Sequence, residues 1–280
     1  MKLLAVIGAG TMGRGIAETA ATHGLDVLVI EVNAQQQSLA QAHIRKSVEK
    51  GIQRGKLQVA SADEVLQRLH WTADLHEAHA AEFVIEAATE NESVKTEILQ
   101  KLDQICPPNI ILATNTSSIS ITRLAAATKH PGRMVGMHFF NPVPIMAPVE
   151  IVRGMNTSDE TLAATRHLAE QLGKQAFVVE DSPGFVVNRV LMPLINEAVF
   201  TLQEGVADAV TIDSLTRLGC NHPMGPLQLA DLIGLDVCLS ILRVLQRELG
   251  DTKFRPCPLL VKMVDAGHLG RKTGRGFYTY

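Results

Sequence analysis

Short apolar runs alternate with amphipathic stretches through the N-terminal part of the chain. The apolar runs end at turn residues, which predicts buried strands at residues 2–7, 25–30, 83–86, 110–113 and 134–137. The stretches between them have helical periodicity, at residues 14–23, 33–69, 92–105 and 119–127. Strands that alternate with helices predict an α/β domain with a mostly parallel, doubly wound sheet.

The pattern changes near Asp181-Ser182-Pro183-Gly184. Long helical patterns follow at residues 185–203, 209–218 and 226–249, and no convincing strand lies among them. We therefore predict two domains, an α/β domain over residues 1–183 and an all-α domain over residues 184–280. The apolar helix faces of the second domain exceed what so small a domain normally buries, which indicates a homodimer contact.

The first predicted strand ends in the turn Gly8-Ala9-Gly10-Thr11-Met12-Gly13, and a helix follows. In a Rossmann-type dinucleotide-binding domain, the first glycine allows the turn, the second lets backbone approach a pyrophosphate, and the third lets helix pack on strand. Glu31 closes the second strand, where a carboxylate binds a ribose 2′-hydroxyl and repels a 2′-phosphate. The motif favours NAD over NADP, although a purely structural glycine turn is the alternative.

Several polar residues fall at the carboxyl ends of the predicted strands. In an open parallel sheet, ligands bind just outside these ends. The residues placed there are Gly8, Glu31, Glu90, Asn115, Ser117 and His138. We expect them to face the dinucleotide, Asn115 and Ser117 included.

His138 is the candidate general base. An imidazole serves in this role when a carboxylate holds its other nitrogen, and Glu150 is the candidate carboxylate. Ser117 could suggest a hydrolase, but the GxSxG nucleophile elbow is absent, so we favour a hydrogen bond from Ser117 to a substrate. Asn188 lies in an apolar helix and is either a packing residue or part of the site.

Composition excludes several classes of function. A net charge of −3 argues against a nucleic-acid or anionic-membrane surface, and no apolar run is long enough to span a membrane. The four cysteines form no CxxC pair, and the histidines near residue 70 lack metal-ligand spacing, so we expect no metal site. Reduced thiols point to a cytoplasmic protein. A basic cluster at residues 45–56 is either a solvated helix face or a phosphate contact.

Six motifs together resemble the short-chain L-3-hydroxyacyl-CoA dehydrogenases, most closely the bacterial members that act on 3-hydroxybutyryl-CoA. The resemblance covers essentially the whole chain. Besides the glycine turn, it is carried by the segments 115–118 (NTSS), 138–144 (HFFNPVP), 181–189 (DSPGFVVNR), 221–226 (NHPMGP) and 270–277 (GRKTGRGF).

The resemblance implies reversible, NAD-dependent oxidation of a (3S)-3-hydroxyacyl-CoA to the 3-ketoacyl-CoA. It implies that His138 is the catalytic base with Glu150 as its partner, and that Ser117 and Asn188 hold the substrate. It further implies cofactor contacts for Glu90, Lys95, Asn141 and Lys272, and a coenzyme A contact for Lys50.

One departure and two alternatives accompany this interpretation. Many relatives have Lys-Leu where this chain has Ala147-Pro148, and a proline there puts the local strand before Glu150 in doubt. A dehydrogenase of a non-CoA hydroxy acid or sugar acid would leave Lys50 on a solvated face. A non-catalytic dinucleotide-binding module would need only the glycine turn and Glu31.

Overall fold

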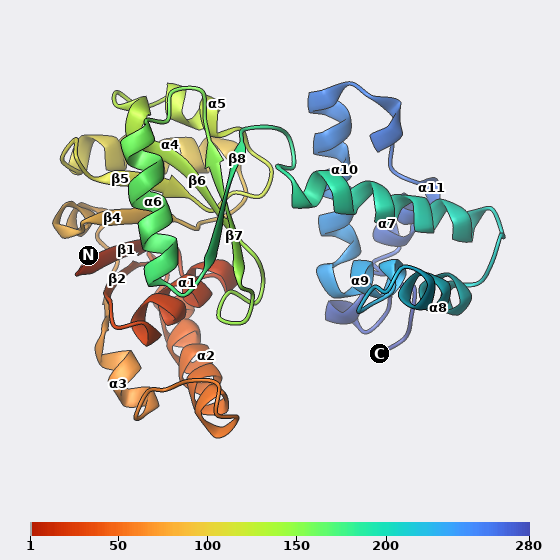
Figure 1. The fold of residues 1–280 in the computed structure, drawn as a ribbon, viewed down its shortest axis with the longest axis horizontal. Helices are drawn as coiled ribbons and strands as arrows, with labels where there is room; N and C mark the ends of the chain where they lie inside the picture. The colour runs from red at the N-terminus through yellow and green to blue at the C-terminus, as the bar shows by residue number, and fades with distance from the viewer. Residues whose placement is uncertain (1) are drawn as a thin grey trace. The chain divides into compact units, whose positions relative to one another are not determined.

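One mixed sheet organises the first of two units in the chain. The computed structural model describes residues 2–280 and divides into Met1–Asp181 and Ser182–Tyr280, which are shown in Figure 1. The boundary predicted from the sequence, after residue 183, lies in the same segment.

The sheet of the first unit has the strand order β3-β2-β1-β4-β5-β6-β7-β8. All neighbouring strands are parallel except β6 and β7, which run antiparallel. The strands are β1 (Leu3–Ile7), β2 (Asp26–Ile30), β3 (Leu69–Thr72), β4 (Phe83–Glu86), β5 (Ile111–Thr114), β6 (Met134–Phe139), β7 (Pro148–Arg153) and β8 (Gln175–Glu180). The predicted, mostly parallel sheet is confirmed.

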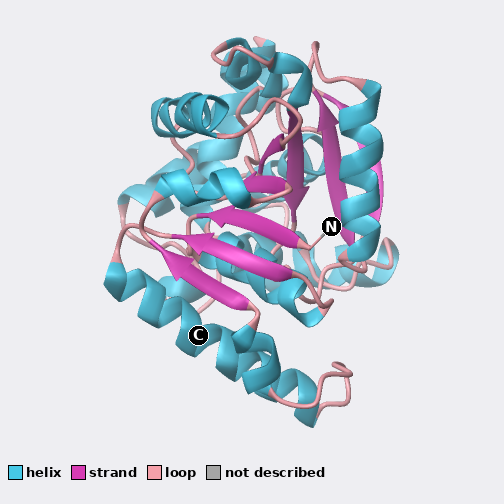
Figure 2. Ribbon diagram, turned by 90° about the vertical axis from the view of Figure 1, so that its left-hand side faces the viewer, coloured by secondary structure: helices cyan, strands magenta, loops and turns pink. Residues whose placement is uncertain are grey.

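Helices cover both faces of this sheet (Figure 2). One face packs against α1, α2 and α6 and the other against α4 and α5, so each face has its own apolar core. The helices are α1 (Thr11–Thr22), α2 (Ala34–Gln53), α3 (Ala62–Gln67), α4 (Glu92–Ile105), α5 (Ile121–Ala126) and α6 (Asp159–Gln171), with 3₁₀ segments η1 (Leu75–Ala80) and η2 (Pro131–Arg133). Because parallel strands are buried on both faces, they read as continuous apolar runs.

The second unit is helical, as predicted. It contains α7 (Val187–Gln203), α8 (Ala209–Gly219), α9 (Pro226–Ile233), α10 (Leu235–Leu249) and α11 (Pro258–Asp265), with η3 (Thr252–Phe254) and η4 (Arg271–Thr273). The single helix predicted at residues 226–249 is wrong, because Gly234, at φ +105°, ends α9 and starts α10 at a new angle. In the core of this unit, the buried Asp231 accepts hydrogen bonds from the N–H groups of Phe277 and Tyr278 and holds the C-terminal segment.

Two further local predictions differ from the structure. The helix predicted at residues 33–69 breaks after Gln53, where Gly55 adopts φ +63° and the N–H of Lys56 bonds the carbonyl of Gly51. Strand β3 then begins at Leu69, where helix was expected. Strand β6 continues through His138 to Phe139, although the sequence suggested an end at residue 137.

The strand before Glu150 forms despite the proline. Pro148 is the first residue of β7, a position at which the missing N–H is tolerated. Along residues 2–280, no helix is long and apolar enough to cross a membrane.

Candidate active site

The glycine turn between β1 and α1 has the geometry of a phosphate cradle. Gly8 adopts φ +96°, and a Cβ at Gly13 would lie 2.0 Å from the Gly8 carbonyl oxygen, so neither position tolerates a side chain. A Cβ at Gly10 would meet nothing within 4 Å, so space lies open in front of that residue. The backbone N–H groups at the start of α1 follow at Thr11 and favour an anion.

Glu31 ties the end of β2 to this turn. Its carboxylate accepts hydrogen bonds from the N–H of Ala9 (3.0 Å) and from the N–H of Asn33 (3.0 Å). The amide of Gln36 donates to the carbonyl of Ala9 at 2.9 Å. Turn and carboxylate therefore fit a dinucleotide, with the pyrophosphate at Gly10 and a ribose at Glu31.

A buried ion pair lies at the carboxyl end of β4. Nζ of Lys95 lies 2.8 Å and 2.9 Å from the two carboxylate oxygens of Glu86, and the hydroxyl of Thr114 donates to the same carboxylate at 2.6 Å. Both charged residues are at most 1% exposed. Glu86 was not predicted as a site residue. The sequence feature that could have revealed it is an acid at the end of an apolar strand with a lysine nine positions later.

Glu90 organises the turn that contains Ser117. It accepts hydrogen bonds from the hydroxyl of Thr116 (2.6 Å) and from the N–H (2.9 Å) and hydroxyl (3.1 Å) of Ser117. Burial raises the pKa of Glu90, but Lys95, 3.7 Å away, and these hydrogen bonds outweigh it and lower the pKa below its usual value. Glu90 is therefore a carboxylate at neutral pH and holds Ser117 by its backbone and side chain.

His138 and Glu150 lie in direct contact, as the sequence suggested. They are direct partners in the antiparallel pair β6–β7, and Nδ1 of His138 lies 2.7 Å from Oε2 of Glu150. His138 is 7% exposed and Glu150 is 4% exposed, so water screens the contact little. Oδ1 of Asn115 accepts a hydrogen bond from the N–H of Phe139 at 2.9 Å, which fastens the end of β5 to that of β6.

The remaining predicted site residues lie apart from this network or in the second unit. Asn141 is exposed in the turn after β6. Asn188 lies near the start of α7 and is 9% exposed, and Lys272 forms an ion pair of 2.6 Å with Asp236 in the second unit. Roles for Lys95, Asn141, Asn188 and Lys272 at the cofactor or substrate stay predictions.

The basic cluster lies on the end of α2 and in the loop after it. Arg45 is neutralised by Asp63 at 2.7 Å. The other members are exposed and have no carboxylate within ion-pair distance among the described residues: Lys46, Lys50, Arg54 and Lys56. Because no internal ion pair neutralises these four cations, they are available to a polyanionic ligand.

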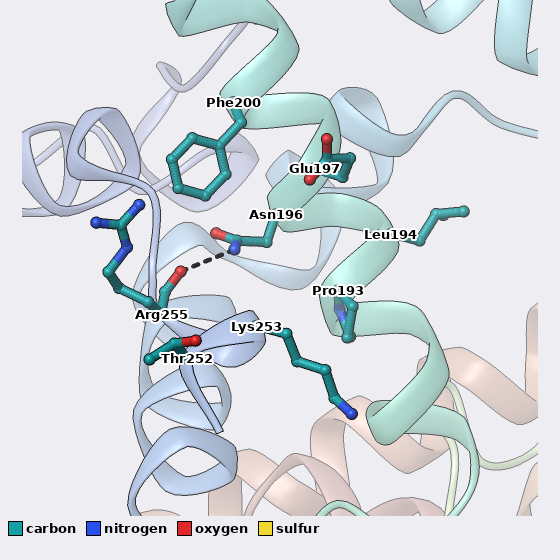
Figure 3. A pocket seen from close by; sticks show the side chains of 8 residues that line it. All are labelled: Pro193, Leu194, Asn196, Glu197, Phe200, Thr252, Lys253 and Arg255. Carbon is teal, nitrogen blue, oxygen red and sulfur yellow. Dashed lines mark hydrogen bonds between the residues drawn. The ribbon is translucent and has the colours of Figure 1, made fainter. Parts of the chain in front are cut away.

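A separate pocket of about 520 Å³ lies in the helical unit, between α7 and η3 (Figure 3). Asn196, in its wall, donates to the carbonyl of Arg255 at 3.0 Å, and the guanidinium of Arg255 lies 5.6 Å from the centre of the Phe200 ring. None of the residues predicted for the site lines this pocket. Within residues 2–280, no group of three or more His, Cys, Asp or Glu side chains could hold a metal ion.

Comparison with known families gives two matches that together span almost the whole chain. Residues 3–182 match the NAD-binding domain of 3-hydroxyacyl-CoA dehydrogenase. Residues 184–280 match the C-terminal domain of the same enzyme family. The two matches meet at the boundary between the two units of the structure.

Individual relatives are similar over almost their full lengths. A probable 3-hydroxybutyryl-CoA dehydrogenase of Bacillus subtilis is 51% identical over 280 residues, which are 100% of this chain and 98% of the relative. The 3-hydroxybutyryl-CoA dehydrogenase of Bradyrhizobium diazoefficiens is 49% identical, over 100% of this chain and 96% of the relative. The crystal structure of (S)-3-hydroxybutyryl-CoA dehydrogenase from Ralstonia eutropha superposes with a TM-score of 0.96 at 49% identity, covering 100% of this chain and 99% of that one.

Proposed function

The chain belongs to the 3-hydroxyacyl-CoA dehydrogenase family, and we propose that it catalyses the reversible, NAD-dependent oxidation of (3S)-3-hydroxybutyryl-CoA to acetoacetyl-CoA. The observation that carries the proposal is the 2.7 Å contact between His138 and Glu150 at the carboxyl-end edge of a dinucleotide-binding sheet. A binding module would need the glycine turn and Glu31, but it would have no use for a buried acid–base pair.

His138 moves the proton in this mechanism. Because Nδ1 faces Glu150, the imidazole exchanges the proton of the substrate hydroxyl at Nε2. The Glu150 carboxylate stabilises the imidazolium that results, and in reduction the same imidazolium protonates the carbonyl oxygen. Bound NAD supplies the redox chemistry at its nicotinamide ring.

Two polar side chains would orient the reacting oxygen. Ser117 is held at the strand end by Glu90, which fixes its backbone and hydroxyl before substrate arrives. Asn188 would contribute its amide from α7. Hydrogen bonds that are in place before the reaction need no reorganisation when charge develops on the oxygen.

We propose NAD, and not NADP, as the cofactor. Glu31 would accept hydrogen bonds from a ribose 2′-hydroxyl, whereas a 2′-phosphate in the same place would meet a carboxylate. No lysine or arginine occurs between Glu31 and Arg45 to neutralise that phosphate. The reaction needs no metal, because His138 handles the proton.

The test is NADH consumption by the purified protein with acetoacetyl-CoA. Parallel reactions with free acetoacetate and with NADPH test the thioester and the cofactor. We expect turnover with acetoacetyl-CoA and NADH, and much slower turnover in both other reactions. No loss of NADH with acetoacetyl-CoA would refute the function, and equal turnover of the free acid would favour a non-CoA hydroxy acid as substrate.

We further propose that the enzyme is a cytoplasmic homodimer. Apolar side chains stand exposed on α7 and α8, among them Val190 (68%), Leu215 (65%) and Leu218 (75%). A second copy would cover them. All four cysteines are free, which suits a reducing compartment. Sedimentation velocity should give twice the monomer mass, and Leu218→Glu should shift the protein toward monomer.

A further inference from the structure

Lys174 is a buried lysine whose charge meets no carboxylate. It is 8% exposed, and its Nζ donates hydrogen bonds to the carbonyl oxygens of Val143 (2.5 Å) and Met146 (2.9 Å). Among residues 2–280, no carboxylate lies within ion-pair distance of this ammonium. Burial lowers the pKa of Lys174 below its usual value. Because burying an ammonium without a counter-charge costs free energy, stability alone does not account for a lysine here.

The two carbonyls that Lys174 binds belong to the turn between β6 and β7. This turn, residues 140–147, is the connection between His138 and Glu150 along the chain. Its remaining backbone bonds are few: the carbonyl of Pro142 accepts from two N–H groups within the turn, and the carbonyl of residue 147 accepts from the N–H of Gln175. Lys174 therefore supplies two of the bonds that fix how β6 leads into β7.

The same turn packs against α1, the helix that follows the glycine turn. Val143 is 2% exposed, and a Cβ at Gly15 of α1 would lie only 3.0 Å from the Cβ of Val143. The side chain of Val143 thus rests on the backbone of α1 just after the glycine turn. Its carbonyl meanwhile accepts from Lys174, so one residue of the turn is held from both sides.

We propose that Lys174 is a positioning residue that holds the β6–β7 turn. By doing so it keeps the spacing of the His138–Glu150 pair and the packing of Val143 against α1. The expected effect of Lys174 on turnover rests on the proposed function. Its effect on NADH binding does not depend on the identity of the substrate.

The test replaces Lys174 by methionine, which has a similar length and no donor, and by arginine, which keeps the charge and the donors. For Lys174→Met we expect kcat to fall ~10–100-fold, because sub-ångström errors in a reacting group are costly. The Kd of NADH should rise several-fold. The pH at which kcat for reduction falls to half should move lower, because a displaced Glu150 stabilises the imidazolium less. Lys174→Arg should restore most of all three quantities.

These measurements distinguish positioning from a merely structural role. A structural role would lower the melting temperature and the fraction of active enzyme, but it would leave the Kd of NADH and the pH profile unchanged. Lys101→Met, at an exposed lysine of α4, is the matched control and should leave all quantities unchanged. A folded Lys174→Met variant with wild-type kcat, NADH affinity and pH profile would overturn the inference.

Val143→Ala keeps the test decisive if Lys174→Met does not fold. It leaves the backbone carbonyl that Lys174 binds and removes part of the contact with Gly15, so we expect weaker NADH binding with a smaller change in kcat. Unchanged NADH affinity in Val143→Ala would overturn the inference. A wild-type protein without activity would count against the proposed function alone, and the NADH affinities of the variants would then decide the role of Lys174.

Discussion

Nδ1 of His138 and Oε2 of Glu150 lie 2.7 Å apart because the two residues oppose each other in the antiparallel pair β6–β7. We expect Glu150→Gln to lower kcat about a hundredfold, because the amide cannot stabilise the imidazolium by charge, and His138→Gln to lower it ~10²–10⁴-fold. Fluorescence titration should show unchanged NADH binding in both variants. Near-normal turnover of His138→Gln would exclude His138 as the base.

Glu90 should affect catalysis because it holds Ser117 in place. Glu90→Gln removes the charge that Lys95 and the hydrogen bonds from Thr116 and Ser117 stabilise, and it places an amide N–H₂ group near the Lys95 ammonium. We expect kcat/KM for acetoacetyl-CoA to fall about tenfold. Glu92→Gln is the control, since Glu92 pairs with Arg123 outside this network. Equal kinetics for Glu90→Gln and wild type would show that the turn does not depend on the carboxylate.

Lys50 should contribute to binding only when the substrate has a nucleotide. Lys50→Glu reverses one charge in the basic cluster at the end of α2, so the KM for acetoacetyl-CoA should rise about tenfold, and less at high salt. The KM for the N-acetylcysteamine thioester of acetoacetate, which lacks phosphates, should not change. Lys129→Glu makes the same charge change at an exposed site outside α2. An unchanged KM for acetoacetyl-CoA would place Lys50 on a solvated face, and a similar rise for both thioesters would show that its effect does not depend on the phosphates.

Glu18 makes stability depend on pH. It is 5% exposed between α1 and α2, and burial raises its pKa from 4.5 to about 7, against the opposing effects of the Ser47 hydrogen bond and of Arg14. The folded chain keeps this proton up to neutral pH, whereas the unfolded chain loses it near pH 4.5. Its contribution to stability is therefore complete below pH 4.5 and is lost as the pH rises through 7.

Glu18→Gln should remove this dependence. Urea unfolding at pH 5 and pH 8 should show that, relative to wild type, the variant gains about 2–3 kcal/mol at the higher pH. Glu170→Gln, at an exposed position of α6, should show no such gain. A constant difference between Glu18→Gln and wild type across this range would contradict the assignment.

Local patterns made a large part of this architecture predictable. Gly8 and Gly13 occupy positions where only glycine fits, so their spacing in the chain reports the backbone geometry directly. His138 and Glu150 are near in sequence, and the helical periodicity of α4 and α7 is long enough to be unambiguous. The helix predictions failed after Gln53 and at Gly234, because a single glycine with positive φ ends a helix without changing the apolar pattern around it.

The contacts of buried lysines were not predictable in the same way. The pairing of Lys95 with Glu86, and of Lys174 with the carbonyl of Val143, depends on which strands and helices become neighbours in space. A lysine in a linear sequence looks solvated whether or not the fold buries it. Only the tertiary structure shows that these two lysines are internal.

The reversed direction of β7 also bears on how the enzyme can diverge. Because one hairpin supplies both His138 and Glu150, their separation is set by backbone hydrogen bonds between β6 and β7 and not by the helices of residues 182–280. Substitutions can accumulate in the helical unit while the proton-transfer geometry is inherited unchanged.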